Sequence, residues 1–153
     1  MAEYATLMVL HTYTPNNGDA LNGSRREWDV RIREWFGSSA VQNGKPVIYC
    51  GDLNVAPFPI DLTSPAKFAR PSAGFGIPKF KEKMEPEDRP DDIGQPGCTP
   101  AEQNRFAQLL ENGKLVDAYR AKNPPAAGAG LDDALPKEEH KEHTFTWRGP
   151  ESG

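Results

Sequence analysis

The sequence is short of cysteine and contains no long apolar run, and each shortage excludes a class of protein. Its two cysteines, Cys50 and Cys98, are too few and too far apart for a disulfide framework or a zinc site, which favours an intracellular protein. No apolar stretch approaches the length that crosses a bilayer, and the first residues lack the layout of a signal peptide. We therefore expect no membrane partner.

Apolar residues are also scarce, at 37% of the 153 residues, whereas prolines and glycines number 15 and 14. Globular domains have an apolar share of about 45–50%, so much of this chain is expected to be loop. The length alone fits one domain.

Basic charge is scarce as well, because the net charge is −4, and a broad surface for binding nucleic acid needs many Lys and Arg residues. Two stretches rich in Pro, Gly or Ala carry most of the acid. Residues 76–98 contain four Lys or Arg and six Asp or Glu, and residues 124–143 contain two and five. These stretches carry −5 together, which leaves +1 for the remainder. Neither has apolar periodicity, so we expect two flexible insertions.

Strand-type and helix-type patterns alternate along the rest of the chain. Apolar runs predict strands over 5–12, 45–50 and 144–147, and helical periodicity predicts helices over 24–36 and 99–113. Each predicted helix begins with a capping box, Ser24 with Glu27 and Thr99 with Glu102. Strands that alternate with amphipathic helices indicate an α/β fold in which helices cover a sheet. Because the first strand begins almost at once, we expect further strands upstream.

The strongest local signal for function is Gly51-Asp52-Leu53-Asn54, which follows the second apolar run. Side chains alternate along a strand, so Asp52 and Asn54 are expected on one face, at the carboxyl end where open α/β sheets bind ligands. A carboxylate there can orient or deprotonate water, and an amide can hold that water or a phosphate oxygen. The alternative is a turn cap, since Asp and Asn are frequent in turns.

A second polar group, Tyr13-Thr14-Pro15-Asn16, follows the first apolar run. If the two strands are neighbours, Tyr13 and Asn16 lie beside Asp52. A phenol and an amide both donate hydrogen bonds, which suits the non-bridging oxygens of a phosphodiester. Taken alone, however, this segment is explained more simply as a strand that ends in a proline turn.

Together the two groups resemble the central part of the exonuclease III type of apurinic/apyrimidinic (AP) endonucleases. The matching blocks, in order, are 13–16, 28–29, 45–56, 60–62, 73–75, positions between 99 and 117, and 144–147. The resemblance implies a partial four-layer α/β sandwich of the endonuclease/exonuclease/phosphatase type. Residues 1–153 would then be an internal portion of one such domain, with insertions at 76–98 and 124–143.

The resemblance also implies roles for four residues. Asp52 would activate or align the attacking water, Asn54 would help to hold water and phosphate, Tyr13 would donate to the phosphate, and Asn16 would hydrogen-bond in the active site. The implied reaction is hydrolysis of the phosphodiester 5′ to an abasic site in double-stranded DNA, with 3′-5′ exonuclease and 3′-phosphodiesterase activity, in base excision repair. The implied cofactor is Mg²⁺, with Mn²⁺ as a substitute, and Asp52 and Asn54 would be weak ligands.

The sequence departs from the family in several places. The family's metal-binding Glu and its partner Asn lie upstream of the first strand, and its closing Asp-His pair lies downstream of 144–147; this sequence contains neither segment. We therefore expect the 153 residues alone to be inactive and the parent protein to be active. Where many relatives have asparagines that contact DNA, this chain has 63–72, in which Lys67 and Arg70 can meet phosphates. No obligate protein partner is evident from the sequence, and we expect an intracellular location, in the nucleus of a eukaryote and otherwise in the cytoplasm.

Two other functions are compatible with the sequence. The same Asp52 and Asn54 arrangement serves other branches of the superfamily, such as inositol or lipid phosphatases and RNA deadenylases. A non-catalytic module could instead keep the scaffold and bind partners through its acidic stretches.

Overall fold

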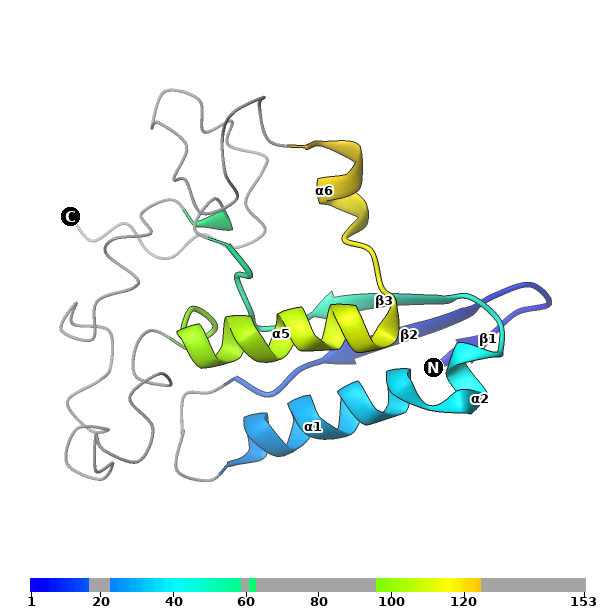
Figure 1. The fold of residues 1–153 in the computed structure, drawn as a ribbon, viewed down its shortest axis with the longest axis horizontal. Coiled ribbons are helices and arrows are strands. Elements are labelled where there is room, and N and C mark those ends of the chain that lie inside the picture. Colours follow the sequence, from blue (N-terminus) through cyan, green and yellow to red (C-terminus); the bar gives the residue numbers. More distant parts are fainter. Residues whose placement is uncertain (17–22, 59–60, 63–95, 125–153) are drawn as a thin grey trace, which may run out of the picture.

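The computed structural model describes residues 1–16, 23–58, 61–62 and 96–124 (Figure 1). The elements within these residues are β1 (Ala2–Glu3), β2 (Met8–Tyr13), α1 (Ser24–Gly37), α2 (Ser39–Gln42), β3 (Val47–Asp52), α5 (Pro100–Gly113) and α6 (Ala118–Lys122). The predicted strand at 144–147 lies outside the described residues, as do most of the predicted insertions. The described end of the first insertion, 96–98, is packed, and Gly97 is buried there.

The three described strands form one sheet in the order β1-β2-β3. β1 pairs antiparallel with β2, and β2 pairs parallel with β3 in a register that sets Tyr13 opposite Asp52. β2 begins later than predicted because the preceding residues turn from β1 into β2, with Tyr4 N donating to Leu7 O at 2.8 Å. Both long strands also end later than predicted, so Tyr13 and Asp52 are the final residues of their strands.

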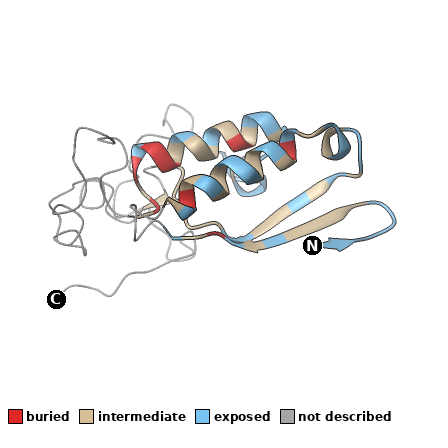
Figure 2. Ribbon diagram, turned by 90° about the horizontal axis from the view of Figure 1, so that it is seen from below, coloured by how far each residue is buried: buried red, intermediate tan, exposed pale blue. Residues whose placement is uncertain are grey.

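Helices α1 and α5 lie side by side over one face of the sheet (Figures 1 and 2). Phe36 of α1 is buried and packs against Tyr49 of β3, with ring centroids 5.2 Å apart. Leu109 of α5 is buried in the same layer. The structure thus confirms a mixed α/β arrangement. Tyr13 and Ile48, whose side chains alternate away from Tyr49, are 71% and 51% exposed.

The capping box predicted for α5 is confirmed. Thr99 is the N-cap, its hydroxyl oxygen accepts from Glu102 N at 3.2 Å, and the Glu102 carboxylate accepts from Thr99 N at the same distance. Pro100 occupies the first turn, where its missing N–H leaves no donor unused. The start of this helix is therefore fixed by four consecutive residues.

The prediction that Ser24 caps α1 is wrong. Gly23 is the N-cap, with a left-handed φ of 69°, and Ser24 is already the first helical residue. Glu27 N donates to Gly23 O, and the Glu27 side chain pairs with Arg31 one turn later. The helix therefore begins one residue earlier than predicted, because Gly23 can adopt the positive φ found at the N-cap.

None of the helices in the described part is long and apolar enough to span a bilayer.

Candidate active site

The two strand ends meet, which was the condition for placing Tyr13 and Asn16 beside Asp52. β2 and β3 are parallel, so their carboxyl ends lie at the same edge of the sheet, and Tyr13 is in register with Asp52. The pairing extends one step further, because Thr14 N donates to Asp52 O at 2.8 Å. The loops after the two strands therefore start from a fixed relative position.

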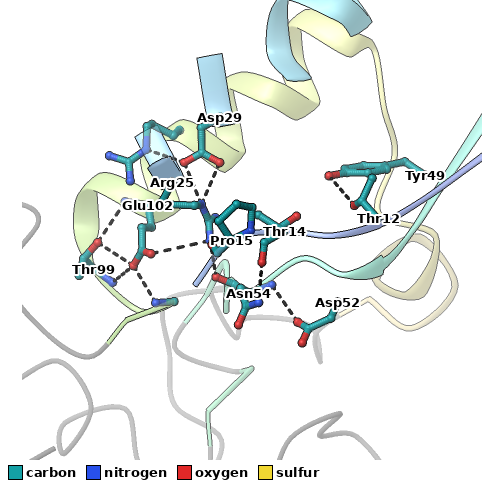
Figure 3. A network of polar contacts seen from close by, with 12 residues as sticks. Thr12, Thr14, Pro15, Arg25, Asp29, Tyr49, Asp52, Asn54, Thr99 and Glu102 are labelled. Carbon is teal, nitrogen blue, oxygen red and sulfur yellow. Dashed lines mark hydrogen bonds and ion pairs between the residues drawn. The ribbon is translucent and has the colours of Figure 1, made fainter. Parts of the chain in front are cut away.

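Asn54 ties the two loops together (Figure 3). Its side-chain Nδ2 donates to Thr14 O at 2.7 Å. Its Oδ1 accepts from Nδ2 of Asn16 at 3.1 Å. Both asparagines predicted for the site are thus in direct contact across the strand ends. Asn16 is exposed and Asn54 is half-buried, so a ligand can approach the pair from solvent.

Asp52 and Asn54 lie side by side for a different reason from the predicted strand alternation. β3 ends at Asp52, and Asp52 Oδ1 accepts from Asn54 N at 3.0 Å, which is the geometry of an Asx turn. Asn54 has a φ of 46°, a left-handed conformation that Asn tolerates better than most residues. Asp52 therefore does cap a turn, and this turn presents the aspartate and the asparagine to one side.

Tyr13 and Asp52 are both exposed at this edge. The Asp52 carboxylate has acceptor sites beyond the one used by Asn54 N, and the Tyr13 phenol can donate or accept. The edge therefore offers one negative charge and one phenol from the two strand ends, and two amides from the loops that follow them.

Arg25 lies buried directly behind these loops, and the sequence did not single it out. Its side chain is 2% exposed, and its Nη1 donates to the main-chain oxygens of Asn54 at 2.8 Å and Pro15 at 3.2 Å (Figure 3). Its Nε donates to both carboxylate oxygens of Asp29, at 2.9 and 3.0 Å. The spacing of Arg25 and Asp29, one helical turn apart, was the available signal.

Glu102 of α5 completes the buried charge cluster. Its Oε2 accepts from Gly97 N at 2.8 Å and from the Thr99 hydroxyl at 2.9 Å, and its Oε1 lies 3.8 Å from Nη1 of Arg25. Burial raises the pKa of Glu102, although the hydrogen bonds from Thr99 and the charge of Arg25 act in the opposite direction. In the sequence, Glu102 stands out only as part of the helix cap.

Curated relatives of the chain are AP endonucleases. The chain is 39% identical to a DNA-(apurinic or apyrimidinic site) endonuclease of Arabidopsis thaliana over 153 residues, which covers 97% of the chain and 35% of the relative. It is 38% identical to the protein of that name from Plasmodium falciparum, covering 78% of the chain and 18% of the relative. It is also 33% identical to the DNA repair nuclease APEX1 of Danio rerio, covering 84% and 33%.

These similarities support placing the chain in the AP endonuclease family. The chain spans about a third or less of the length of these three relatives. No protein-family model matches the chain. Membership of the AP endonuclease family agrees with the order of the blocks in the sequence and with the meeting of the two strand ends.

The described residues provide few ligands for a metal ion. Among them, no group of three or more His, Cys, Asp and Glu side chains could hold an ion. Asp52 has free acceptor sites and fits a divalent ion that takes its other ligands from phosphate and water. The Asn54 amide is already hydrogen-bonded at both its oxygen and its nitrogen, so its role as a metal ligand stays a prediction.

Cys98 does not add a nucleophile or a soft metal ligand at this end of the sheet. Burial raises the pKa of its thiol to about 11, and the negative charge of Glu102 acts in the same direction. The thiol is therefore protonated at neutral pH, whereas thiol nucleophiles and metal ligands act as thiolates.

Two predicted DNA-binding residues, Lys67 and Arg70, lie outside the described residues. Their contacts with phosphates stay predictions.

Proposed function

We propose that the protein carrying this chain is an AP endonuclease that hydrolyses the phosphodiester 5′ to abasic sites in double-stranded DNA. The proposal includes 3′-5′ exonuclease and 3′-phosphodiesterase activity within base excision repair, in the nucleus if the organism is eukaryotic. The single observation that carries it is the contact between Asn16 and Asn54, which joins two family motifs into one polar site beside Asp52. The relatives are an endonuclease named for apurinic or apyrimidinic sites and a DNA repair nuclease, which supports the same substrate.

The proposed chemistry uses the donors and acceptors of the site residues that are not already engaged in hydrogen bonds between the loops. Asp52 is exposed and accepts one hydrogen bond from Asn54 N, so its remaining lone pairs can align or deprotonate a water molecule. Each amide nitrogen of Asn16 and Asn54 has two N–H groups and uses one in the contacts above, which leaves one to donate to a phosphate oxygen. Tyr13 adds a phenolic donor. Fixed donors of this kind stabilise the charge that develops on phosphorus oxygens.

We also propose Mg²⁺ or Mn²⁺ as the cofactor. When bound, such an ion would stabilise negative charge on the phosphate and on the leaving oxygen. Asp52 is its proposed ligand among the described residues, and one carboxylate alone holds a divalent ion weakly. The 153 residues alone are therefore proposed to be inactive, and further ligands are proposed to come from elsewhere in the protein.

The proposed fold is the four-layer sandwich, with residues 1–153 as an internal portion of it. The sheet face that carries Tyr13 and Ile48 supports this proposal, because apolar and aromatic side chains on a sheet face normally pack against another layer. Lys67 and Arg70 are proposed to contact backbone phosphates, which would position DNA without reading its sequence.

A panel of substrates tests the proposed function. The whole protein is incubated, with and without EDTA, with a duplex containing one abasic site, with the same duplex fully paired, and with an inositol phosphate. We expect nicking only of the abasic duplex and only without EDTA, because the reaction needs a divalent ion. Nicking is measured on a denaturing gel as a labelled strand of the one length set by cleavage at the abasic site, which distinguishes it from exonucleolytic trimming of 3′ ends.

Two outcomes would contradict the proposal. Turnover of the inositol phosphate with an intact abasic duplex would assign the site to another branch of the superfamily. An intact abasic duplex together with an unreacted inositol phosphate would favour a non-catalytic module.

A further inference from the structure

Arg25 joins the two loops of the proposed active site through their main chains. Pro15 immediately precedes Asn16, and Asn54 is the residue that contacts Asn16; Arg25 Nη1 donates to the carbonyl oxygens of both Pro15 and Asn54. These acceptors are 10 and 29 residues away from Arg25 in the sequence. One guanidinium therefore holds the backbone on both sides of the asparagine contact.

The guanidinium is itself held from both helices. The single N–H of Arg25 Nε is shared between both carboxylate oxygens of Asp29, and Asp29 in turn is paired with Arg105 of α5 at 2.7 Å. Glu102 of α5 lies 3.8 Å from Nη1. A buried ionic cluster costs desolvation energy, and apolar side chains of similar size would often stabilise a fold as well or better. The cluster therefore calls for an explanation other than stability.

The loop geometry supplies that explanation. Asn54 has a left-handed φ of 46°, which costs less in Asn than in most residues but is still stabilised by the contacts around it. Its carbonyl oxygen is fixed by Arg25, while its side chain contacts Thr14 O and Asn16. Lysine at this position would keep the charge but would lose the planar fork that serves Asp29 and both carbonyls at once.

We propose that Arg25 is a positioning residue of the site, which sets the relative placement of Asn16 and Asn54 by bonding the carbonyls of Pro15 and Asn54. Arg25 is buried and acts through these loops rather than on the substrate. The inference rests on the proposed function for its catalytic consequence, whereas the placement of the two asparagines can be measured without activity.

The test compares Arg25→Lys and Arg25→Met with Arg31→Met in the whole protein. Arg31 lies on the same helix, is 73% exposed and pairs with Glu27 on the surface, so Arg31→Met is a matched control. We expect kcat for abasic-site nicking to fall about 10-fold in Arg25→Lys and about 100-fold in Arg25→Met, with little change in KM, because misplacement of catalytic groups by about 1 Å has effects of this size. The control is expected to keep the wild-type values.

A second readout follows the side-chain amide NMR signals of Asn16 and Asn54, assigned by Asn→Asp substitution at each position. A cooperative thermal melt first shows that the Arg25→Lys protein is folded. Both amide signals are then expected to shift in Arg25→Lys, and neither is expected to shift in Arg31→Met. Wild-type kcat in a folded Arg25→Lys, or unmoved amide signals, would overturn the inference. If Arg25→Met does not fold, the kcat and the amide signals of Arg25→Lys alone test the inference. If wild type and control do not nick the duplex, the proposed function fails, and the amide signals still decide whether Arg25 positions the loops.

Discussion

Replacing Asp52 by Asn is expected to lower the single-turnover rate of abasic-site nicking about 10³-fold, within the range lost when a general base is removed. The expected loss is chemical rather than structural. The amide oxygen of the new side chain can still accept from Asn54 N, as Asp52 Oδ1 does at 3.0 Å, so the turn after β3 is kept. What disappears is the negative charge that aligns or deprotonates water and helps to hold a divalent ion.

The matched control for this substitution is Asp117→Asn. Asp117 caps α6 by accepting from Arg120 N at 2.9 Å. Asp117→Asn therefore also removes one negative charge while the new side chain can keep this hydrogen bond. The rates are measured with excess protein over labelled duplex, and folding is checked by thermal melting. We expect the control to nick at the wild-type rate. Equal rates for Asp52→Asn and wild type would remove Asp52 from the mechanism.

Replacing Gly51 by Ala is expected to lower the free energy of unfolding by about 3 kcal/mol or more, the scale of a backbone strain combined with lost ladder hydrogen bonds. A Cβ at Gly51 would lie 1.9 Å from the carbonyl oxygen of Thr12, a main-chain atom of the neighbouring strand. Gly51 also has a φ of 126°, which residues with a side chain rarely adopt. β3 would have to move away from β2 at the point where the site begins.

Gly37→Ala provides the control for the loss of a glycine. Gly37 is the last residue of α1, and a Cβ there would meet nothing within 4 Å. Alanine is also the better helix former, by about 1 kcal/mol, so we expect unchanged or slightly raised stability. Chemical denaturation followed by circular dichroism measures both variants. A Gly51→Ala variant as stable as wild type would contradict the observed strand geometry.

The parts of this structure that local sequence determines were predictable. Thr99, Pro100 and Glu102 lie within four residues and form the cap that their order indicates. The two apolar runs, each with polar residues after it, predicted one polar site on the condition that the strands are neighbours, because parallel neighbours end at one edge. Both predictions depend on contacts that are short in sequence or on a general rule of sheet geometry.

The parts that depend on tertiary contacts were not predictable. In the sequence, Arg25 looks like an ordinary helical arginine. Its acceptors, the carbonyls of Pro15 and Asn54, lie beside it only in the folded chain. Strand alternation gave the correct neighbours for Asp52 but the wrong reason, because the positive φ of Asn54 belongs to a turn. Similarly, the capping-box pattern predicted Ser24 as the N-cap of α1, but Gly23 is the N-cap. The pattern considers side-chain hydrogen bonds and leaves out the backbone freedom of glycine.

The central claim is that the loops after β2 and β3 act as one unit on a single phosphodiester. The most direct measurement is a double-mutant cycle of Asn16→Ala and Asn54→Ala, using kcat/KM for abasic-site nicking by the whole protein. Because the two amides are in contact at 3.1 Å, we predict a coupling of about 0.5–3 kcal/mol, with the double variant losing little more than the worse single variant. Single effects that simply add would show that the two loops act independently, which contradicts the claim.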